Sequence, residues 1–425
     1  MVIIRNIQTY YFNIMRLGCF VLKRYIAFFL ILALTLSVQV SADEKAVKVS
    51  SECDISDIDV PIEAVTVNAA IGQKLDIKAK SAILMEPNTG EILYEANSDE
   101  KLSPASITKI MSLLLIMEAI DRGEFTTDTV ITASEHACSM GGSQIWLEPG
   151  ESMTVDELLK ATVIASANDA CVALGEYLAG SEEGFVALMN ERAKELGMNN
   201  TNFVNCTGLD AEGHLTSAHD VAVMSSELIK HDLIKQYSTV WMDSLRDGKS
   251  ELVNTNKLVR FYEGTTGLKT GTTGTAKYCL SATAERNGLE LVAVVMAGET
   301  SNDRFNGAKK LLDYGFANYS FQVLNAELKE TEVPIEKGVK KNIKINTEDR
   351  LNLLLPKTSK EEITRTTEWN NNITAPIKKG DVLGYVNIKV GENEAGRIEI
   401  TADEDVNKLS LWTTIGWILT GIFRI

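Results

Sequence analysis

The sequence lacks the residues that metal sites and disulfide frameworks usually require. It contains four histidines and six cysteines among 425 residues, and no two cysteines form a Cys-x-x-Cys pair. Zinc binding and a disulfide framework are therefore unsupported. Basic residues are also too few to outweigh the acidic ones, 42 against 58, which gives a formal net charge of −16. Charge alone therefore gives no reason to expect nucleic acid or an anionic lipid surface as a partner.

Apolar residues, by contrast, are plentiful. They make up 45% of the chain, against 24% charged residues, which is the composition of a globular protein with substantial cores. A chain of 425 residues has room for two or three domains. Cys171 and Cys279 lie in apolar stretches, where a buried small side chain is the expected role.

The first 42 residues have the organisation of an export signal. Lys23 and Arg24 precede an almost wholly apolar run at 25–38, and Val40 and Ala42 are small residues at the −3 and −1 positions of a cleavage site. We expect this segment to be a secretory signal peptide. It carries four basic residues and no acidic one, so its removal shifts the net charge from −16 to −20. An uncleaved anchor is the alternative, and in either case the rest of the chain is exported.

The next part of the chain predicts a mixed helix and sheet domain. Residues 43–78 are polar and acidic and predict an N-terminal leader. Two apolar runs then flank the turn residues 87–90, which indicates a hairpin. Apolar positions recur at helical spacing over 154–179, whereas residues 278–296 predict two neighbouring strands. Helices combined with an antiparallel sheet imply an α/β or α+β sandwich, which we place at 79–320.

The C-terminal part predicts two further elements. Short alternating runs indicate a small all-β domain at 323–406. The last segment, 407–425, is too short for a comfortable membrane span of about 20 residues. Its apolar residues gather on one side of a helix, and Trp412 and Trp417 favour a membrane interface. We therefore expect an amphipathic anchoring helix, with docking on the chain's own domain as the alternative.

Ser106 and Lys109 are the first candidates for chemistry. They stand three residues apart at the start of the apolar stretch 103–119, SPASITKIMSLLLIMEA, whose spacing places both in the first turn of a buried helix. Positions i and i+3 share a helix face, so Lys109 can reach the Ser106 hydroxyl and activate it as a nucleophile. Alone, S-x-x-K is a weak signal. Ser98 and Lys101 give a second match, in a polar stretch that indicates a loop.

Two further motifs strengthen this interpretation. Ser166-Ala167-Asn168 and Lys269-Thr270-Gly271 follow in the chain, and each alone is typical of a helix cap or a turn. In this order, S-x-x-K, S-x-N and K-T-G form the set found in penicillin-binding proteins and class A β-lactamases. The stretch from about residue 81 to 319 resembles the catalytic domain of D-alanyl-D-alanine carboxypeptidases, the low-molecular-mass penicillin-binding proteins. PASITKIM, GLKTGTT, LGMNNTNFVNCTGL and RFNGAKKLL are similar to that family as well.

The resemblance implies a β-lactamase/DD-peptidase-like catalytic domain of the α/β (α+β) class, followed by the small all-β domain and the terminal helix. It also implies that the terminal D-alanine of a peptidoglycan stem peptide ending in D-Ala-D-Ala is removed through an acyl-enzyme, and that β-lactams acylate the same serine. No metal or cofactor is needed for this reaction. The enzyme would act at the cell wall, on the outer face of the cytoplasmic membrane.

The same resemblance implies a role for each site residue. Ser106 attacks the carbonyl of the penultimate D-alanine, Lys109 accepts its proton, and Ser166 relays a proton to the departing amine. For this, Lys109 must be neutral, which requires burial or nearby cations to lower its pKa from about 10.4. The N–H groups of Ser106 and Thr272 form the oxyanion hole. The implied substrate-binding residues are Asn168, Lys269, Thr270, Gly271, Thr272 and Arg304, the last at the position that binds the terminal carboxylate.

Two other functions fit the same motifs. A class A-like β-lactamase would add a glutamate that activates the deacylating water, and Glu195 superficially imitates its E-x-x-L-N motif. A wall-binding relative without catalysis is the second alternative, which the intact Ser106, Lys109 and Lys269 argue against. Lys277 stands where many relatives have glycine, which bears on substrate preference. His214 is expected to be structural.

Overall fold

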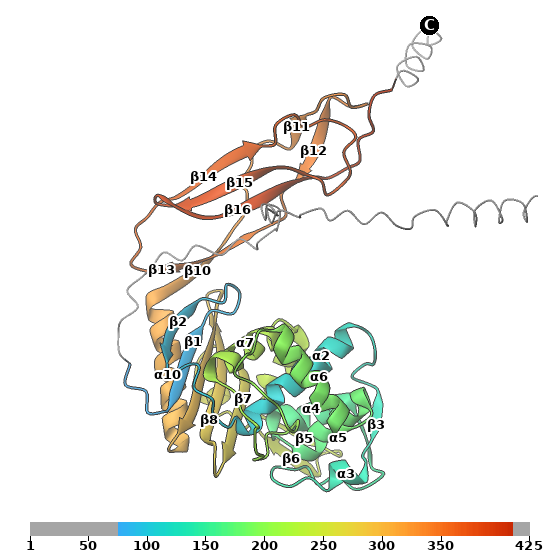
Figure 1. Ribbon diagram of the computed structural model, residues 1–425, viewed down its shortest axis with the longest axis vertical. Coiled ribbons are helices and arrows are strands. Elements are labelled where there is room, and N and C mark those ends of the chain that lie inside the picture. Colours follow the sequence, from blue (N-terminus) through green and yellow to red (C-terminus); the bar gives the residue numbers. More distant parts are fainter. Residues whose placement is uncertain (1–74, 411–425) are drawn as a thin grey trace, which may run out of the picture. The chain divides into compact units, whose positions relative to one another are not determined.

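The computed structural model describes residues 75–410 (Figure 1). The predicted signal peptide at 1–42 lies outside these residues, as do most of the leader at 43–78 and nearly all of the helix predicted at 407–425. Within the described part of the chain, no helix is both long enough and apolar enough to cross a membrane.

A five-stranded antiparallel sheet forms the centre of the first domain. Its strand order is β2-β1-β9-β8-β7. The hairpin predicted around residues 87–90 is confirmed as the pair β1–β2, and the two strands predicted within 278–296 are confirmed as β8 and β9. The bounds are Ser81–Met85 (β1), Ile92–Ala96 (β2), Thr265–Thr273 (β7), Lys277–Arg286 (β8) and Leu289–Gly298 (β9).

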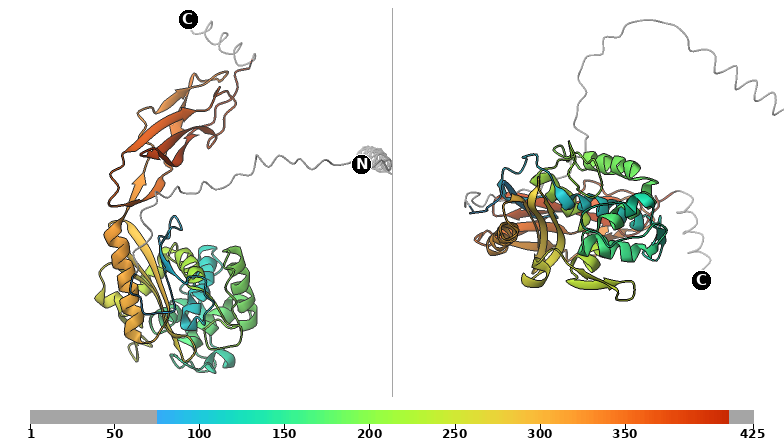
Figure 2. Two further views of the ribbon diagram at one scale, coloured as in Figure 1. Left: turned by 60° about the vertical axis from the view of Figure 1, so that its left-hand side comes forward. Right: turned by 90° about the horizontal axis from the view of Figure 1, so that it is seen from below.

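Strand β9 shows that the sheet is buried on both faces. Leu291, Ala293 and Val295 pack in one apolar cluster with α10, whereas Val292 and Val294 pack in another with α2 and α7. This follows because successive side chains of a strand point to opposite faces. Helix α10 therefore covers one face, and the helical block covers the other (Figure 2).

The helical block consists of η1 and helices α2 to α8, whose buried apolar residues share one cluster. Helix α2 is its centre, since ten of its 13 residues are buried. Two short antiparallel pairs, β3 with β4 and β5 with β6, border the block. The bounds are Ala105–Thr108 (η1), Lys109–Asp121 (α2), Val130–Thr132 (β3), Glu135–Cys138 (α3), Ser152–Thr154 (β4), Val155–Ile164 (α4), Asn168–Ala179 (α5), Glu182–Glu195 (α6), Ala218–Leu228 (α7), Asp232–Ser238 (α8), Met242–Leu245 (β5), Ser250–Val253 (β6), Leu258–Phe261 (α9) and Ser301–Asn318 (α10).

The helical pattern predicted over 154–179 is divided into two helices. Helix α4 ends at Ile164, and α5 begins at Asn168. Between them Ser166 has a φ of 64°, a left-handed conformation that a right-handed helix cannot continue through. Hydrophobic spacing alone does not detect this break, because both helices bury an apolar face in the same core. The break leaves Ser166 at a corner between two buried helices.

The residues after α10 form an all-β domain, as predicted, and its first strand begins at Tyr319, before the predicted bound of 323. Strands β10 and β13 pair, and five more strands form an antiparallel sheet in the order β11-β12-β16-β15-β14. Val386 and Ile388 of β15 and Ile398 and Ile400 of β16 are buried in its core. The bounds are Tyr319–Leu324 (β10), Glu332–Pro334 (β11), Asn342–Asn346 (β12), Leu351–Pro356 (β13), Ile363–Trp369 (β14), Val382–Val390 (β15) and Asn393–Ala402 (β16).

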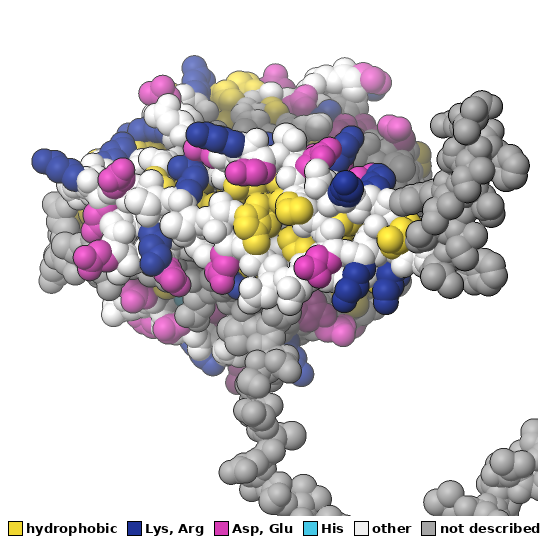
Figure 3. Space-filling view, turned by 90° about the horizontal axis from the view of Figure 1, so that it is seen from above, with side chains coloured by type: hydrophobic (Ala, Val, Ile, Leu, Met, Phe, Trp, Pro, Cys, Tyr) yellow, Lys and Arg dark blue, Asp and Glu magenta, His cyan; other side chains and the backbone are white. Residues whose placement is uncertain are grey.

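The face drawn in Figure 3 carries both signs of charge. Lysine and arginine side chains alternate there with aspartate and glutamate around a small group of hydrophobic side chains. A surface with interspersed charges does not attract one kind of polyion over a long range.

Helix α6 packs against α5 at Gly175, where Phe185 of α6 lies close to the glycine. A substitution of Gly175 therefore tests this packing. A methyl group at Gly175 would lie 2.5 Å from Cδ1 of Phe185, whose side chain is fully buried. We expect Gly175→Ala to lower the free energy of unfolding by about 1–3 kcal/mol through overpacking, although alanine is the better helix former. Urea unfolding measures the change. Gly274→Ala is the matched control, because its methyl group would meet nothing within 4 Å. A Gly175→Ala protein as stable as wild type would contradict this description of the packing.

Candidate active site

The structure brings the three predicted motifs together. Ser106 lies in the 3-10 turn η1, and Lys109 is the first residue of α2. The sequence predicted one helical turn for both, and the 3-10 turn achieves the same result because side chains at i and i+3 eclipse one another in it. Strand β7, which carries residues 269–272, packs against η1, and α5 packs against α2. Asn168 is the first residue of α5.

Lys109 is the centre of the hydrogen-bond network. Its Nζ lies 3.2 Å from Ser106 Oγ, 2.5 Å from Asn168 Oδ1 and 2.7 Å from the carbonyl oxygen of Thr207. The side chain is fully buried. Burial disfavours the charged form and lowers the pKa of Lys109 to about 8. A neutral amine beside a serine hydroxyl is therefore accessible near physiological pH.

Lys269 is a second buried cation at the site. It is 1% exposed, and its Nζ donates to the carbonyl oxygen of Thr270 at 3.3 Å. Burial lowers its pKa well below the ordinary lysine value, and the charges of Lys109 and Arg304 lower it further. Within residues 75–410, none of these three cations forms an ion pair with a carboxylate.

Asn168 is fixed by all of its polar groups. Its backbone N–H donates to the carbonyl oxygen of Ser143 at 2.7 Å, and its side-chain Nδ2 donates to that of Gly141 at 2.6 Å. Its Oδ1 accepts from Lys109. Asn168, which the resemblance implies as a substrate-binding residue, therefore holds Lys109 in this structure.

Two glycines allow the site to assemble. A methyl group at Gly271 would lie 2.8 Å from the carbonyl oxygen of Pro104 and 3.1 Å from Ile107 N, and one at Gly208 would lie 1.8 Å from the carbonyl oxygen of Ala105. The two contacts with carbonyl oxygens, at 2.8 and 1.8 Å, are shorter than real Cβ atoms make. The glycine of K-T-G is thus required because β7 passes directly against the turn that holds the nucleophile.

Arg304 is buried beside the K-T-G strand, although its place near the start of a helix would also suit a surface residue. Its Nη1 donates to the carbonyl oxygen of Gly271 at 3.0 Å and to Thr272 Oγ1 at 2.9 Å. The guanidinium also lies over the rings of Tyr278 and Phe305, at 5.4 and 4.9 Å from their centroids. The structure therefore places Arg304 next to Thr272.

The remaining predicted residues lie in the same region. Ser166 is buried at the corner between α4 and α5. Thr270 Oγ1 donates to Thr255 Oγ1 at 2.6 Å, which ties β7 to the segment after β6. Glu195, considered for a β-lactamase, is an exposed residue at the end of α6 whose carboxylate accepts from Arg192 at 2.9 Å.

Sequence reasoning missed the residues that support the site from other segments. Thr207 contributes only a carbonyl oxygen, which no side-chain motif reveals. Asp169 is buried, and its carboxylate accepts the N–H groups of Ile145 and Leu147, so it holds the loop whose carbonyls bind Asn168. The sequence did offer one sign of Asp169, because it directly follows Asn168 of the S-x-N motif.

His214 is structural, as expected. Its Nδ1 accepts the N–H of Val204 at 2.9 Å, and its Nε2 lies 2.8 Å from Thr108 Oγ1. With Nδ1 an acceptor, the neutral ring carries its proton on Nε2 and donates to Thr108. His214 therefore fastens the 204–214 segment to the turn that contains the nucleophile.

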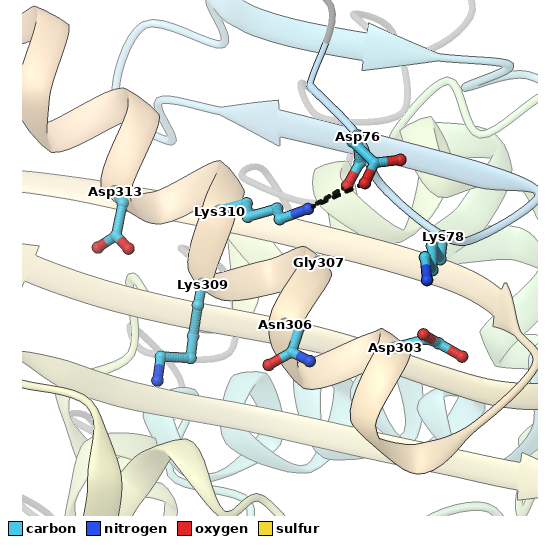
Figure 4. A pocket seen from close by; sticks show the side chains of 8 residues that line it. All are labelled: Asp76, Lys78, Asp303, Asn306, Gly307, Lys309, Lys310 and Asp313. Atoms are coloured by element: carbon cyan, nitrogen blue, oxygen red, sulfur yellow. Dashed lines mark hydrogen bonds and ion pairs between the residues drawn. The ribbon is translucent and has the colours of Figure 1, made fainter.

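A hollow on the outer side of α10 is separate from this site. It is drawn in Figure 4, where Lys310 of α10 pairs with Asp76 at 3.6 Å. Helix α10 covers the face of the sheet opposite to the helical block that carries Ser106. The hollow mixes lysine and aspartate side chains and contains no residue of the S-x-x-K, S-x-N and K-T-G motifs.

Comparisons with known proteins agree with this arrangement. Residues 65–300 match the family described as D-alanyl-D-alanine carboxypeptidase, and residues 320–408 match the family described as penicillin-binding protein 5, C-terminal domain. The chain is 45% identical over 341 residues to the D-alanyl-D-alanine carboxypeptidase DacF of Bacillus subtilis, which covers 79% of this chain and 88% of that protein.

Solved structures give the same result. Penicillin-binding protein 5 from Haemophilus influenzae matches with a TM-score of 0.67 and 29% identity, covering 79% of this chain and all of that one. Penicillin-binding protein D2 from Listeria monocytogenes, in its ampicillin-bound form, matches with a TM-score of 0.53 and 32% identity, covering 57% of this chain and all of that one.

The burial of His214 predicts a loss of stability in mild acid. Burial lowers the pKa of His214 to about 4, whereas in an unfolded chain it is about 6.5. Between these values the unfolded chain binds a proton that the folded protein does not. The free energy of unfolding therefore falls as the pH drops from about 6.5 to about 4, by up to about 3 kcal/mol. Urea unfolding of wild type and His214→Gln across this range measures the effect. The variant should lose less stability with acid, and equal slopes would contradict the prediction.

Proposed function

The chain belongs to the D-alanyl-D-alanine carboxypeptidase family, and from this premise we propose a role for each residue of the site in a serine-type hydrolase. The enzyme removes the terminal D-alanine from peptidoglycan stem peptides, and penicillins acylate it. The observation that carries the residue assignment is the contact between the buried Nζ of Lys109 and Ser106 Oγ, at 3.2 Å.

Acylation begins with the proton of Ser106. Lys109, in its neutral form, accepts this proton as Ser106 Oγ attacks the carbonyl carbon of the penultimate D-alanine. The N–H groups of Ser106 and Thr272 stabilise the resulting oxyanion. The C–N bond then breaks, the proton passes to the leaving amine through Ser166, and D-alanine departs. The lowered pKa of Lys109 supports this sequence, because an ordinary lysine would be protonated at neutral pH.

Hydrolysis completes the cycle. Water attacks the ester carbonyl, Ser106 regains its proton, and the peptide leaves one D-alanine shorter. A β-lactam enters the same first step through its strained amide, with Ser106 Oγ bonded to the opened ring carbonyl. The ampicillin-bound form of the Listeria relative supports this step for the present chain.

The cations of the site bind the terminal carboxylate of the substrate. Lys269 and Arg304 are buried and lack carboxylate partners within the described residues, and Thr270 and Thr272 present hydroxyl groups on the same strand. An anionic ligand would relieve the cost of burying these charges. The hydrogen bond of 2.9 Å between Arg304 and Thr272 Oγ1 supports their joint action.

The location of the substrate outside the membrane supports export of the enzyme. Residues 1–42 would act as the signal peptide, and the amphipathic helix at 407–425 would hold the enzyme at the outer face of the cytoplasmic membrane. Between them the catalytic domain would occupy 79–320 and the all-β domain 323–406. The family matches at 65–300 and 320–408 support this division.

The β-lactamase alternative is not favoured. Its deacylation needs a glutamate beside the acyl-enzyme, whereas Glu195 is exposed and is bound by Arg192. A non-catalytic relative is not favoured either, because the contacts of Lys109 with Ser106 and Asn168 are those of a working base.

Covalent trapping tests the nucleophile. After benzylpenicillin, intact-mass analysis of the protein should show one stable adduct, and the protein without inhibitor should release D-alanine from a D-Ala-D-Ala peptide. Ser106→Ala should lose both the adduct and D-alanine release. Ser98→Ala is the matched control from the second S-x-x-K match, and its adduct should remain. An adduct on Ser106→Ala would refute the assignment, and rapid loss of the wild-type adduct without peptide hydrolysis would favour a β-lactamase.

The role of Lys109 predicts a pH profile. The pKa of the base is about 8 and its neutral form is active, so kcat/KM for the peptide should rise about tenfold per pH unit below 8 and level off above it. Lys109→Arg should reduce kcat/KM by at least about 100-fold at every pH, because arginine stays charged. A wild-type kcat/KM that is flat between pH 6 and 9 would contradict the base assignment.

A further inference from the structure

The loop that supplies Thr207 to the site ends in an exposed carboxylate, that of Asp210. Asn205 fastens the loop, because its Oδ1 accepts the N–H groups of Thr207 and Gly208 at 3.2 and 2.7 Å and its Nδ2 donates to the carbonyl oxygen of Leu209 at 2.9 Å. Gly208 also packs tightly against the turn that carries the nucleophile. Asp210 is therefore held in a fixed position relative to Ser106.

Asp210 bridges the two segments that flank the reacting bond. Its Oδ1 accepts from Thr273 Oγ1 at 2.7 Å and from Ser103 Oγ at 3.4 Å. Thr273 follows Thr272 on β7, and Ser103 precedes Ser106 by three residues. Within residues 75–410, Asp210 forms no ion pair, and no donor binds its second oxygen, Oδ2. This oxygen is available to a ligand.

The order of residues along β7 shows which part of the substrate meets Asp210. Under the roles proposed above, Lys269 and Thr270 bind the carboxylate of the leaving D-alanine, and the N–H of Thr272 binds the reacting carbonyl. Thr273 is the last residue of the strand. A peptide lying along β7 therefore extends its acyl side past Thr273, so that the residue before D-Ala-D-Ala comes next to Asp210.

The charges of the site are opposite at its two ends. Cations gather where the substrate carboxylate binds, and Asp210 places an anion at the acyl end. A substrate that complements both ends has a C-terminal carboxylate and, on the residue before the two D-alanines, a side chain with a free amine. Charges a few ångströms apart at a surface interact measurably, since the Debye length is about 8 Å at physiological salt.

We propose that Asp210 is a specificity-determining residue, which selects stem peptides whose third residue carries a cationic amine over those in which that position is neutral. The inference rests on the proposed function and deepens it, because it names the class of acyl donor that the site prefers.

Two peptides that differ only in this amine test the proposal. Nα-acetyl-L-lysyl-D-Ala-D-Ala keeps the ε-ammonium group, and the Nε-acetylated peptide lacks it. The measurement is the ratio of their kcat/KM values, from D-alanine release at low ionic strength. Wild type should favour the free amine roughly two- to fivefold, the size of an exposed ion pair. The ratio should fall toward one in about 1 M salt, where the Debye length is about 3 Å.

Variants of the loop separate charge from structure. Asp210→Asn keeps an oxygen for Thr273 and should bring the ratio close to one. Asp210→Lys should reverse the preference toward a peptide whose lysine is succinylated and therefore anionic. Glu212→Gln removes an exposed carboxylate two residues away and should keep the wild-type ratio.

The outcomes distinguish this inference from the function on which it rests. If wild type hydrolyses neither peptide, the carboxypeptidase assignment fails and the inference fails with it. If wild type hydrolyses both peptides with equal kcat/KM, or if Asp210→Asn retains the preference, Asp210 does not select the amine and the carboxypeptidase assignment still stands.

Discussion

The structure of the site depends on one buried amine. Lys109 is held by an amide oxygen from α5, by a carbonyl oxygen from the loop that contains Thr207, and by the hydroxyl of Ser106. All three are neutral oxygens, so the ammonium form gains hydrogen bonds but no countercharge. Burial lowers the pKa of Lys109 by more than the charge of the nearby Asp169 raises it, and a lowered pKa is the property that a base acting on serine needs. Replacing Asn168 with an aspartate would supply the missing charge and hold Lys109 protonated.

The same reasoning extends to the rest of the cleft. Lys269 and Arg304 are also buried without a carboxylate partner among the described residues, in a protein with a net charge of −16. Although the protein is rich in acidic residues, Lys109, Lys269 and Arg304 form no ion pair with a carboxylate among the described residues of the site. Under the proposed function, the carboxylate of a bound substrate would supply the opposite charge that these buried cations lack. Asp210, at the other end of the cleft, carries a negative charge, and by the inference above it favours a positively charged group of the substrate.

The fold brings four segments that are distant in the sequence together at the site. They are η1 with the start of α2, the start of α5, the loop that contains Thr207, and β7. The antiparallel sheet presents β7 at its edge, and both of its faces are covered, by α10 and by the helical block. Because β7 is an edge strand, its free side can accept an extended peptide. The glycine of K-T-G lets this edge approach the 3-10 turn, and the break between α4 and α5 places Asn168 where its Oδ1 accepts from Lys109. Each of these features packs on the same apolar core, in which Ile107, Ala167 and Leu268 are buried.

The sequence by itself determined the motifs, their order, the strand pairs β1–β2 and β8–β9, the all-β domain and the pairing of Ser106 with Lys109. These are local properties, set by spacing within one turn or one hairpin. Only the tertiary structure decided that Thr207 binds Lys109, that Arg304 is buried, that Ser166 breaks a helical pattern, and that Asp210 lies beside Thr273. The contacts of Lys109 with Asn168 and Thr207 join residues 59 and 98 positions apart. No periodicity encodes such separations, because they follow from how whole elements pack.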